Sequence, residues 1–263
     1  MRKDQSQQQL MEFAVKIAIA SGNIARKYFR TPVSVDSKSK QQFDPVTVAD
    51  REIEQFLRNK IRKHYPDHGI IGEEQGVTAG NSSTWVIDPI DGTRGFISGT
   101  PMWGTLLGLL NNGKPALGLM HQPFVRETFY ADRNAAWLRQ GTTVRQLSTR
   151  PTRKLGEAIL FCTHPSMFDQ AADRNAFARI ESACRYSRFG SDCYGYCLLA
   201  AGFVDLVVEA DLKPYDIIPL IPLIESAGGV VTDWQGKTPM NGGRIIAAAN
   251  RRLHRAALEL LNE

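Results

Sequence analysis

Apolar residues recur at helical spacing in two segments of the first third of the chain. The first segment extends from Leu10 to Phe29, and an irregular stretch then reaches Pro45. The second segment ends before Pro66 and repeats the spacing with Ile53, Phe56, Leu57 and Ile61. Apolar residues three and four positions apart line one face of a helix. We therefore expect two amphipathic helices separated by a loop.

Shorter apolar segments in the middle of the chain predict strands. Residues 105–110 and 116–120 flank Asn112-Gly113, a dipeptide typical of a type I′ hairpin turn. Residues 127–131 and 136–138 continue the strand pattern. We expect these segments to form a mixed antiparallel sheet.

Helices and strands alternate beyond Gly141, which marks a soft boundary within what we expect to be a single domain of residues 1–263. The expected strands are 158–163, 185–188, 205–208 and 244–248, and the expected helices are 170–184, 192–201, 216–228 and 251–261. Pro219 and Pro222 fall within the third of these helices. Because an interior proline removes a backbone hydrogen bond, we expect a bend at Pro222.

Two carboxylates stand at the end of an apolar strand. Residues 85–87 predict that strand, and Asp88 and Asp91 follow it, together with a proline and a glycine that should stop it. Carboxylates three positions apart across a turn suit the oxygen coordination of Mg2+, and the Ile90 carbonyl can join them. The alternative is that Asp-Pro and Asp-Gly pairs mark ordinary turns.

The residues after these aspartates suggest an anion site next to the metal site. Beyond Gly92, Thr93 and Arg94 should begin a helix. The free N–H groups at a helix start attract a phosphate dianion. Metal and phosphate would then be held side by side.

Three further acids occupy comparable positions. Glu73 follows a short apolar pair and offers a third metal ligand. Asp216 lies in the first turn of a predicted helix, and Asp50 precedes the apolar face of another. Helix capping alone would explain either aspartate.

Composition fits a compact enzyme and argues against two kinds of partner. The chain has 263 residues, of which 43% are hydrophobic and 22% charged, so it can bury a substantial core. Its formal charge is +5, but lysine and arginine are scattered without a long basic run, so we expect no nucleic-acid partner. The longest hydrophobic stretch, 217–224, is too short to span a bilayer, and we expect no membrane association.

Cysteine usage indicates a reducing compartment. Cys162, Cys184, Cys193 and Cys197 form no CxxC pair. The first residues are polar and rich in glutamine, unlike a signal peptide. We therefore expect free thiols and a cytoplasmic protein.

Four separated motifs resemble those of the Mg2+-dependent, lithium-sensitive phosphatases typified by inositol monophosphatase. The motifs are residues 72–74, 88–93, 190–192 and 215–216, and the resemblance extends over residues 13–261. It implies an α/β (α+β) fold, a layered α-β-α-β-α sandwich of the inositol monophosphatase and fructose-1,6-bisphosphatase type. It also implies a homodimer and two or three Mg2+ ions per active site. The implied metal ligands are Glu73, Asp88, the Ile90 carbonyl, Asp91 and Asp216.

The same resemblance implies the catalytic roles. Thr93 matches the residue that orients the nucleophilic water, Asp50 matches a carboxylate near that water, and Lys38 matches a lysine near the third metal. Paired metals can neutralise the phosphate while Thr93 and Glu73 hold the attacking water. An exposed loop lysine is the alternative for Lys38. A phosphatase that uses an aspartyl nucleophile is a poorer fit, because both aspartates of the 88–93 motif are needed as ligands.

The sequence around Thr93 differs from that of the inositol enzymes. Those enzymes commonly continue Gly-Thr-Thr-Asn, whereas this chain has Gly92-Thr93-Arg94-Gly95. Together with residues 188–196 and 212–216, this motif resembles the histidinol-phosphate phosphatase branch of the family. We therefore expect the substrate to be a small phosphate ester, L-histidinol phosphate, hydrolysed to L-histidinol and phosphate in histidine biosynthesis.

Candidate substrate residues follow from the charge of that ester, which carries an amine and an imidazole. Asp192 and Glu209 are acids beyond the metal ligands and suit a cationic group. On the phosphate side we assign Gly92, Thr93, Arg94 and Arg188. Either arginine can instead shape the pocket by pairing with its acids, and Asp192 can instead be a helix cap.

Two other functions stay open. The first is an inositol-1-monophosphatase or a phosphatase of broad sugar-phosphate specificity. The second is a metal-binding or nucleic-acid-binding protein without catalysis, suggested only by the basic isoelectric point of about 9.1. The set of acids together with Thr93 argues against the second.

Overall fold

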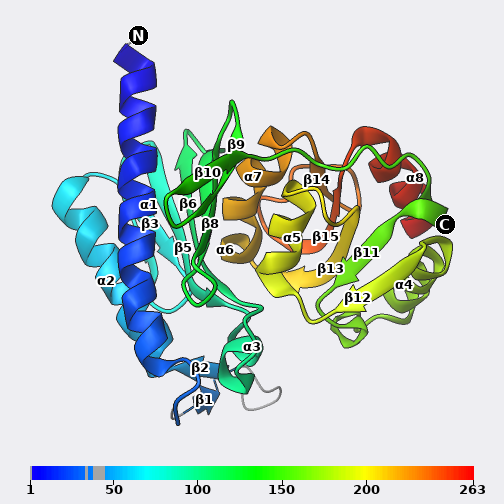
Figure 1. Ribbon diagram of the computed structural model, residues 1–263, viewed down its shortest axis with the longest axis horizontal. Helices are drawn as coiled ribbons and strands as arrows, with labels where there is room; N and C mark the ends of the chain where they lie inside the picture. Colours follow the sequence, from blue (N-terminus) through cyan, green and yellow to red (C-terminus); the bar gives the residue numbers. More distant parts are fainter. Residues whose placement is uncertain (1, 33–34, 38–44) are drawn as a thin grey trace.

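Helices and sheets alternate in five layers in the computed structural model, which describes residues 2–32, 35–37 and 45–263 (Figure 1). The layers are α1 and α2, an eight-stranded sheet, a central layer of short helices, a five-stranded sheet, and α4 with α8. This arrangement confirms the predicted α-β-α-β-α sandwich.

The outer helical layer consists of α1 (Arg2–Tyr28) and α2 (Val48–His64). α2 begins where Thr47 and Asp50 form a reciprocal capping box, and it ends before Pro66, as predicted. Their apolar faces pack with the first sheet in one buried cluster that includes Ile53 and Trp85. The loop expected between them contains an antiparallel pair, β1 (Val35–Ser37) and β2 (Pro45–Thr47), so that part of the expectation was wrong.

The first sheet has the strand order β10-β9-β8-β7-β6-β5-β3-β4. Its strands are β3 (Gly69–Gly72), β4 (Gly76–Thr78), β5 (Ser83–Asp91), β6 (Gly104–Asn111), β7 (Lys114–Gln122), β8 (Glu127–Asp132), β9 (Ala136–Gln140) and β10 (Thr143–Gln146). At the hairpin tip, Asn112 and Gly113 have φ values of 50° and 72°, which confirms the predicted type I′ turn. β4 and β10 escaped prediction because both are short edge strands with mostly exposed side chains. The sheet ends at Gln146, slightly beyond the expected boundary.

The central layer contains α5 (Asp192–Ala200), α6 (Pro214–Ile217), the 3-10 turn η3 (Ile218–Leu220) and α7 (Ile221–Ser226). A single helix was expected over the last three elements. The two prolines divide it, because each falls in the first turn of a new segment, where its missing N–H costs least. η3 lies directly against the first sheet, since a Cβ at Gly118 of β7 would overlap the Pro219 carbonyl oxygen.

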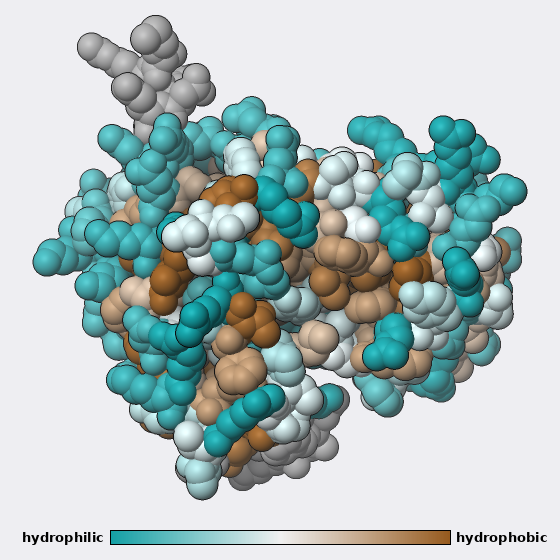
Figure 2. Space-filling model, in the orientation of Figure 1, coloured by the Kyte–Doolittle hydropathy of each residue, from teal (hydrophilic) through white to brown (hydrophobic). Residues whose placement is uncertain are grey.

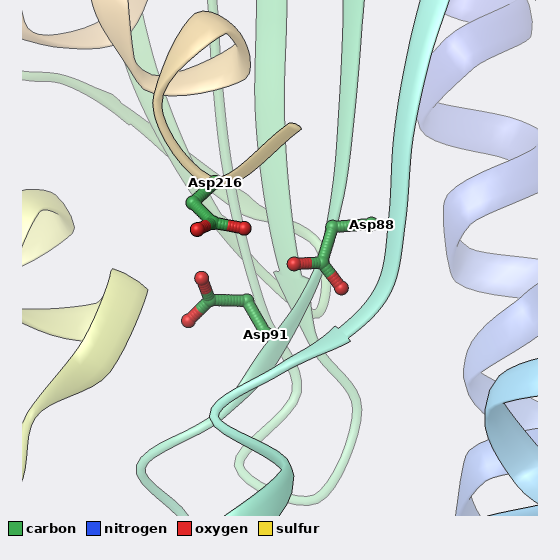
Figure 3. Close-up of side chains that lie close together, drawn as sticks. All are labelled: Asp88, Asp91 and Asp216. Atoms are coloured by element: carbon green, nitrogen blue, oxygen red, sulfur yellow. The ribbon is translucent and has the colours of Figure 1, made fainter. Parts of the chain in front are cut away.

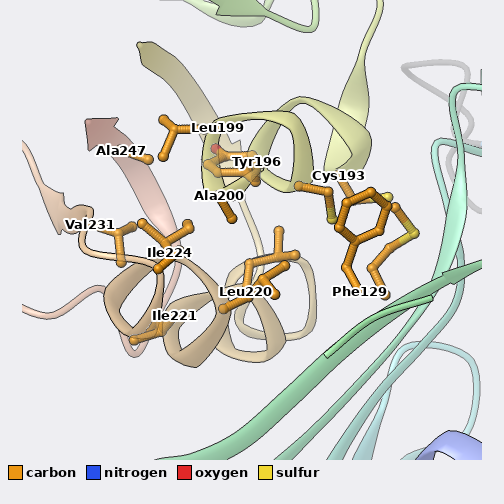
Figure 4. Packing of buried hydrophobic residues seen from close by; sticks show 14 of the residues in the cluster. Phe129, Cys193, Tyr196, Leu199, Ala200, Leu220, Ile221, Ile224, Val231 and Ala247 are labelled. Carbon is orange, nitrogen blue, oxygen red and sulfur yellow. The ribbon is translucent and has the colours of Figure 1, made fainter. Parts of the chain in front are cut away.

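Apolar side chains from the central helices join the two sheets. Phe129 of the first sheet, Tyr196 and Leu220 of the central layer, and Val231 and Ala247 of the second sheet belong to one buried cluster (Figure 4). Burying each large side chain contributes about 1.5–3 kcal/mol. The two halves of the molecule are therefore held together by a continuous core.

The second sheet has the order β12-β11-β13-β15-β14. Its strands are β11 (Ile159–Cys162), β12 (Tyr186–Phe189), β13 (Leu206–Leu212), β14 (Val230–Asp233) and β15 (Gly243–Ala248). Its outer face is covered by α4 (Ala171–Ala183) and α8 (Arg251–Leu261), with the 3-10 turns η1 (Leu155–Glu157) and η2 (Pro165–Met167) in the connections. β14 was not expected, because only two of its residues are apolar.

Hydrophilic residues spread over the face shown in Figure 2, and hydrophobic residues reach it in small patches. Among the described residues, no helix is long and apolar enough to cross a membrane. All four cysteines are free, as predicted.

Candidate active site

A bulge at the end of β5 brings two aspartates to one side of the sheet. Asp88 pairs with Leu106 and Asp91 with Gly104, so β5 gains one extra residue over its partner. In a regular strand, side chains three positions apart point to opposite faces; the bulge reverses this. Proline is compatible with a bulge because the extra residue needs no ladder hydrogen bond. The strand thus includes both aspartates, whereas the predicted strand covered only residues 85–87.

Asp216 joins these two aspartates from the central layer. It is the third residue of α6, and its Oδ2 accepts a hydrogen bond from the Lys213 backbone N–H at 2.7 Å. One carboxylate oxygen from each of Asp88, Asp91 and Asp216 lies within 4.8 Å of the others (Figure 3). The structure therefore brings together three of the expected metal ligands from two separate parts of the chain.

The electrostatics of this cluster fit a divalent cation. Burial raises the pKa of Asp88 well above its usual value, and the charges of Glu73, Asp91 and Asp216 raise it further. Burial also raises the pKa of Asp216 to about 7. Asp88 is only 2% exposed, and its Oδ1 has no hydrogen-bond partner among the described residues. Buried carboxylates at this density require a counter-charge, and oxygen ligands of this kind suit Mg2+.

Glu73 lies in the turn that follows β3, where its backbone N–H donates to the Ile87 carbonyl at 3.2 Å. Glu54 of α2 holds the turn in place, because its carboxylate accepts hydrogen bonds from the Glu74 and Gln75 N–H groups at 2.7 and 3.0 Å. Arg58 donates to the same carboxylate at 2.7 Å.

Sequence reasoning missed this buried pair. The signal was two charged residues, four positions apart, on the apolar face of a predicted helix. Glu54 is fully buried and Arg58 is 1% exposed. Such a pair is held only where other polar groups need its hydrogen bonds.

Asp50, an expected catalytic residue, does not line the pocket, and Lys38, another, lies outside the described residues. Asp50 is buried, and its Oδ2 accepts from the Thr47 N–H and hydroxyl at 2.8 and 2.6 Å. Burial raises its pKa to about 6, and the charge of Glu73 contributes, so the two acids are neighbours. Asp50 therefore caps α2, and its place near a nucleophilic water stays a prediction.

The predicted helix after β5 is present as α3 (Thr93–Ser98). Gly92 precedes it with φ of 85°, and a Cβ there would approach the Met102 carbonyl oxygen to 2.7 Å, so both backbone angle and space require glycine. The Thr93 hydroxyl donates to the Ile90 carbonyl at 3.0 Å. Its lone pairs therefore remain available to accept a hydrogen bond from a water in the pocket.

Acids from α5 and β13 face the metal cluster. Asp192 begins α5 with φ of 43°, and the next N–H, that of Cys193, donates to Asp91 Oδ1 at 2.9 Å. The pKa of Asp192 is raised by burial and by the charges of Asp91 and Glu209, whereas Arg94 lowers it. Asp192 therefore lies beside the metal cluster, close enough to Asp91 and Glu209 for their charges to act on it.

Glu209 is already engaged by neutral hydrogen-bond donors. Its carboxylate accepts from the Thr163 N–H and hydroxyl at 2.8 and 2.6 Å and from the Tyr196 hydroxyl at 2.9 Å. Neither Thr163 nor Tyr196 was singled out from the sequence as a support for an acid, and Tyr196 also belongs to the buried core. The structure makes both of them supports for this acid.

These groups surround one pocket of about 280 Å³. Among the residues that line it are the predicted Glu73, Asp88, Ile90, Asp91, Gly92, Thr93, Arg94, Asp192, Glu209 and Asp216. Arg188 is exposed on β12 and does not line the pocket. The pocket therefore gathers the predicted metal ligands, the start of α3 and two further acids, a combination suited to a metal-bound phosphate ester.

Comparison with known proteins adds an independent finding. The model of the Inositol monophosphatase family matches residues 6–263. The bifunctional phosphatase IMPL2 of Arabidopsis thaliana, a chloroplastic protein, is 41% identical over 257 residues, which cover 93% of this chain and 72% of the relative. The histidinol-phosphatase of Chlorobaculum parvum is 30% identical, with 93% of each chain covered. An inositol monophosphatase structure from Zymomonas mobilis matches with a TM-score of 0.85 at 34% identity, covering 97% of this chain and 98% of that one.

Proposed function

Because this chain belongs to the inositol monophosphatase family and is a metal-dependent phosphomonoesterase, we propose that it hydrolyses L-histidinol phosphate to L-histidinol and phosphate. The observation that carries this choice is the second group of acids, Asp192 and Glu209, which line the same pocket as the metal cluster. A polyol phosphate offers such acids no cationic partner.

Two or three Mg2+ ions are part of the proposal. Glu73, Asp88, the Ile90 carbonyl, Asp91 and Asp216 would hold them, and the orphaned Oδ1 of Asp88 supports this assignment. When bound, Mg2+ supplies charge neutralisation at the phosphate and lowers the pKa of water.

The chain's own groups would orient the reactants. Thr93 donates its proton to the Ile90 carbonyl, so its oxygen can accept a hydrogen bond from the attacking water and fix that water's direction. Arg94 lines the pocket beside Thr93 and suits the phosphate oxygens, since a guanidinium matches their geometry. Positioning of this kind reduces the entropy that an uncatalysed reaction must lose.

At the other end of the ester, Asp192 is the group best placed to receive the amine or imidazole. Burial, and then the charges of Asp91 and Glu209, raise the pKa of Asp192, so a cation beside it would be stabilised and would favour its ionised form. Glu209 would act alongside it or through Thr163 and Tyr196, whose hydrogen bonds occupy both of its oxygens. Arg188 contributes to this scheme only if a substrate reaches the exposed face of β12.

A second candidate, an inositol or sugar monophosphatase, is favoured by the 34% identity to the Zymomonas mobilis enzyme. The two candidates share the metal cluster and differ in the organic part of the ester. A panel of L-histidinol phosphate, inositol 1-phosphate and sugar phosphates, assayed with Mg2+, separates them. A clear preference in kcat/KM for histidinol phosphate is expected. A clear preference for inositol 1-phosphate would replace our proposal with the second candidate.

We also propose a homodimer in the cytoplasm. Tyr186 and Phe189 on the edge strand β12 are 47% and 43% exposed, which supports an interface at this edge. The four free cysteines support a reducing compartment. Light scattering of the purified protein tests the assembly, and a mass of one chain would contradict it.

A further inference from the structure

A second pocket lies on the far side of the first sheet, beneath the C-terminal half of α1. It has a volume of about 250 Å³ and is framed by α1, the turn between β7 and β8, and the end of β9. None of its lining residues lines the active-site pocket. The volume is below the ~300–1,000 Å³ usual for pockets that hold drug-sized ligands, so the pocket suits a small molecule.

The charge of this second pocket is uniform. Arg26 of α1, Arg126 of the turn and Arg139 of β9 all line it, and no carboxylate does. Among the described residues, none of the three arginines forms an ion pair. Three guanidinium groups around one small space repel one another unless an anion lies among them.

Most N–H groups of these three arginines donate no hydrogen bond to a described residue. Arg26 uses one Nη2–H on the Asn23 side-chain oxygen at 2.6 Å, and Arg139 uses its Nε–H on the Gly141 carbonyl at 3.0 Å. Arg126 donates to no described residue. A guanidinium carries five N–H donors, so the rim retains many that a phosphate group can accept.

The floor of the pocket is fixed and neutral. His121 is 5% exposed, and its Nδ1 lies 2.9 Å from the Thr128 hydroxyl and 3.2 Å from the Glu127 carbonyl. Burial lowers the pKa of His121 to about 4, and the positive charge of Arg26 adds a smaller lowering, so the imidazole is neutral near pH 7. A Cβ at Gly22 would come within 2.6 Å of His121 Nε2, so α1 can lie this close only with glycine there.

We propose that this second pocket, framed by Arg26, Arg126 and Arg139, is a binding site for a small anion that carries a phosphate group. The bound group is either free orthophosphate or the phosphate of a small organic molecule. This site is independent of the reaction proposed above, because it lies on a different face of the sheet and consists of different residues.

Titration calorimetry on the full chain in EDTA tests this site, with inorganic phosphate and methylphosphonate as probes at constant ionic strength. EDTA removes the metals on which phosphate binding in the active site depends. For Arg126→Gln/Arg139→Gln, we expect the Kd of the preferred probe to rise about tenfold or more, since two charge-assisted contacts are lost. Arg145→Gln, on the exposed neighbouring strand β10, is the matched control and should leave the Kd unchanged.

The two probes distinguish the sources of the phosphate group. Tighter binding of orthophosphate indicates the free ion, and tighter binding of methylphosphonate indicates an organic ligand; both support the site. Crystals soaked in tungstate should show an anomalous peak among the three arginines. Absence of binding by either probe, or equal Kd values for the double variant and the wild type, would overturn the proposal. Unchanged phosphatase activity with Mg2+ in the double variant shows that it is folded.

Discussion

Asp91 combines a structural hydrogen bond with a charge, and one substitution separates them. The Cys193 N–H donates to Asp91 Oδ1 at 2.9 Å. In Asp91→Asn the amide oxygen can still accept this hydrogen bond, so α5 should keep its position. The charge needed for the metal is lost. We expect kcat to fall by at least about 100-fold, since even residues that only support metal ligands cost 10–100-fold.

Asp67→Asn, an exposed acid after α2, is the control for Asp91→Asn and should keep full activity. Steady-state assays with Mg2+ measure both variants, and circular dichroism confirms their folds. Near-normal turnover of Asp91→Asn would remove this residue from the metal site.

Asp192 tests the choice of substrate. Asparagine tolerates the left-handed backbone conformation found there, so Asp192→Asn should preserve the start of α5. A hydrogen bond to a charged group contributes about 1.5–3 kcal/mol, so kcat/KM for histidinol phosphate should fall about 10–100-fold. Hydrolysis of an aryl phosphate, whose organic part carries no charge, should change little. Equal losses for both esters would show that Asp192 does not select the cationic group.

His121 makes folding stability depend on pH. Its pKa is about 4 in the folded protein and about 6.5 when exposed, because burial and the charge of Arg26 disfavour protonation. Arg126 and the Glu127 carbonyl also face the imidazole. Between these pH values only the unfolded chain binds the proton, so stability falls as pH falls from 6.5 to 4, by about 3 kcal/mol in total.

Urea unfolding at a series of pH values measures this loss. His121→Gln should lack this part of the pH dependence, whereas His64→Gln, at an exposed histidine, should retain it. Parallel pH profiles for the wild type and His121→Gln would show that the His121 imidazole has the same pKa in the folded and the unfolded chain.

Elements with strong local signals were predictable from the sequence. α8 has the predicted bounds, 251–261, because its apolar period is regular, and the Asn112-Gly113 turn follows from the backbone angles these residues permit. Glu73, Asp88 and Asp91 were found because each comes at the end of a short apolar segment. The bulge in β5 was not predictable, since it depends on pairing with β6, which local sequence does not reveal. The division of the α6–α7 segment likewise depends on how η3 packs against Gly118.

The turn after β3 shows how one element positions another. Glu54→Gln would remove the charge that Arg58 neutralises and replace one acceptor oxygen by a donor facing backbone N–H groups. The Glu73 side chain would lose its fixed position. We expect the Mg2+ concentration for half-maximal activity to rise about tenfold, a supporting-residue effect, and the free energy of unfolding to fall by about 3–5 kcal/mol.

A Mg2+ titration of activity, at a temperature where Glu54→Gln is folded, measures the first effect. A merely structural role would lower stability without changing the Mg2+ requirement. Gln55→Ala, on the exposed side of the same helix, should change neither.

At the scale of the whole molecule, the active site lies where separate layers meet. β5 and the turn after β3 belong to the first sheet, α5 and α6 to the central layer, and β13 to the second sheet (Figure 1). Apolar packing holds these layers together, while the acids they bring into the pocket repel one another. The metal-free molecule therefore contains a local destabilisation that a bound cation relieves.

Mg2+ should consequently stabilise the entire fold. A ligand that binds only the folded state adds about 2.7 kcal/mol to the free energy of unfolding at roughly 100 times its Kd. Because Asp216 comes from the central layer and Asp88 and Asp91 from the first sheet, the cation links two layers and should raise the unfolding midpoint of the whole molecule. In Asp216→Asn the Lys213 N–H can still be capped, but the increase should be largely lost. Thermal unfolding with Mg2+, against NaCl of equal ionic strength, measures the difference. An equal increase in both proteins would mean that Mg2+ acts elsewhere on the surface and that the three aspartates do not share a cation.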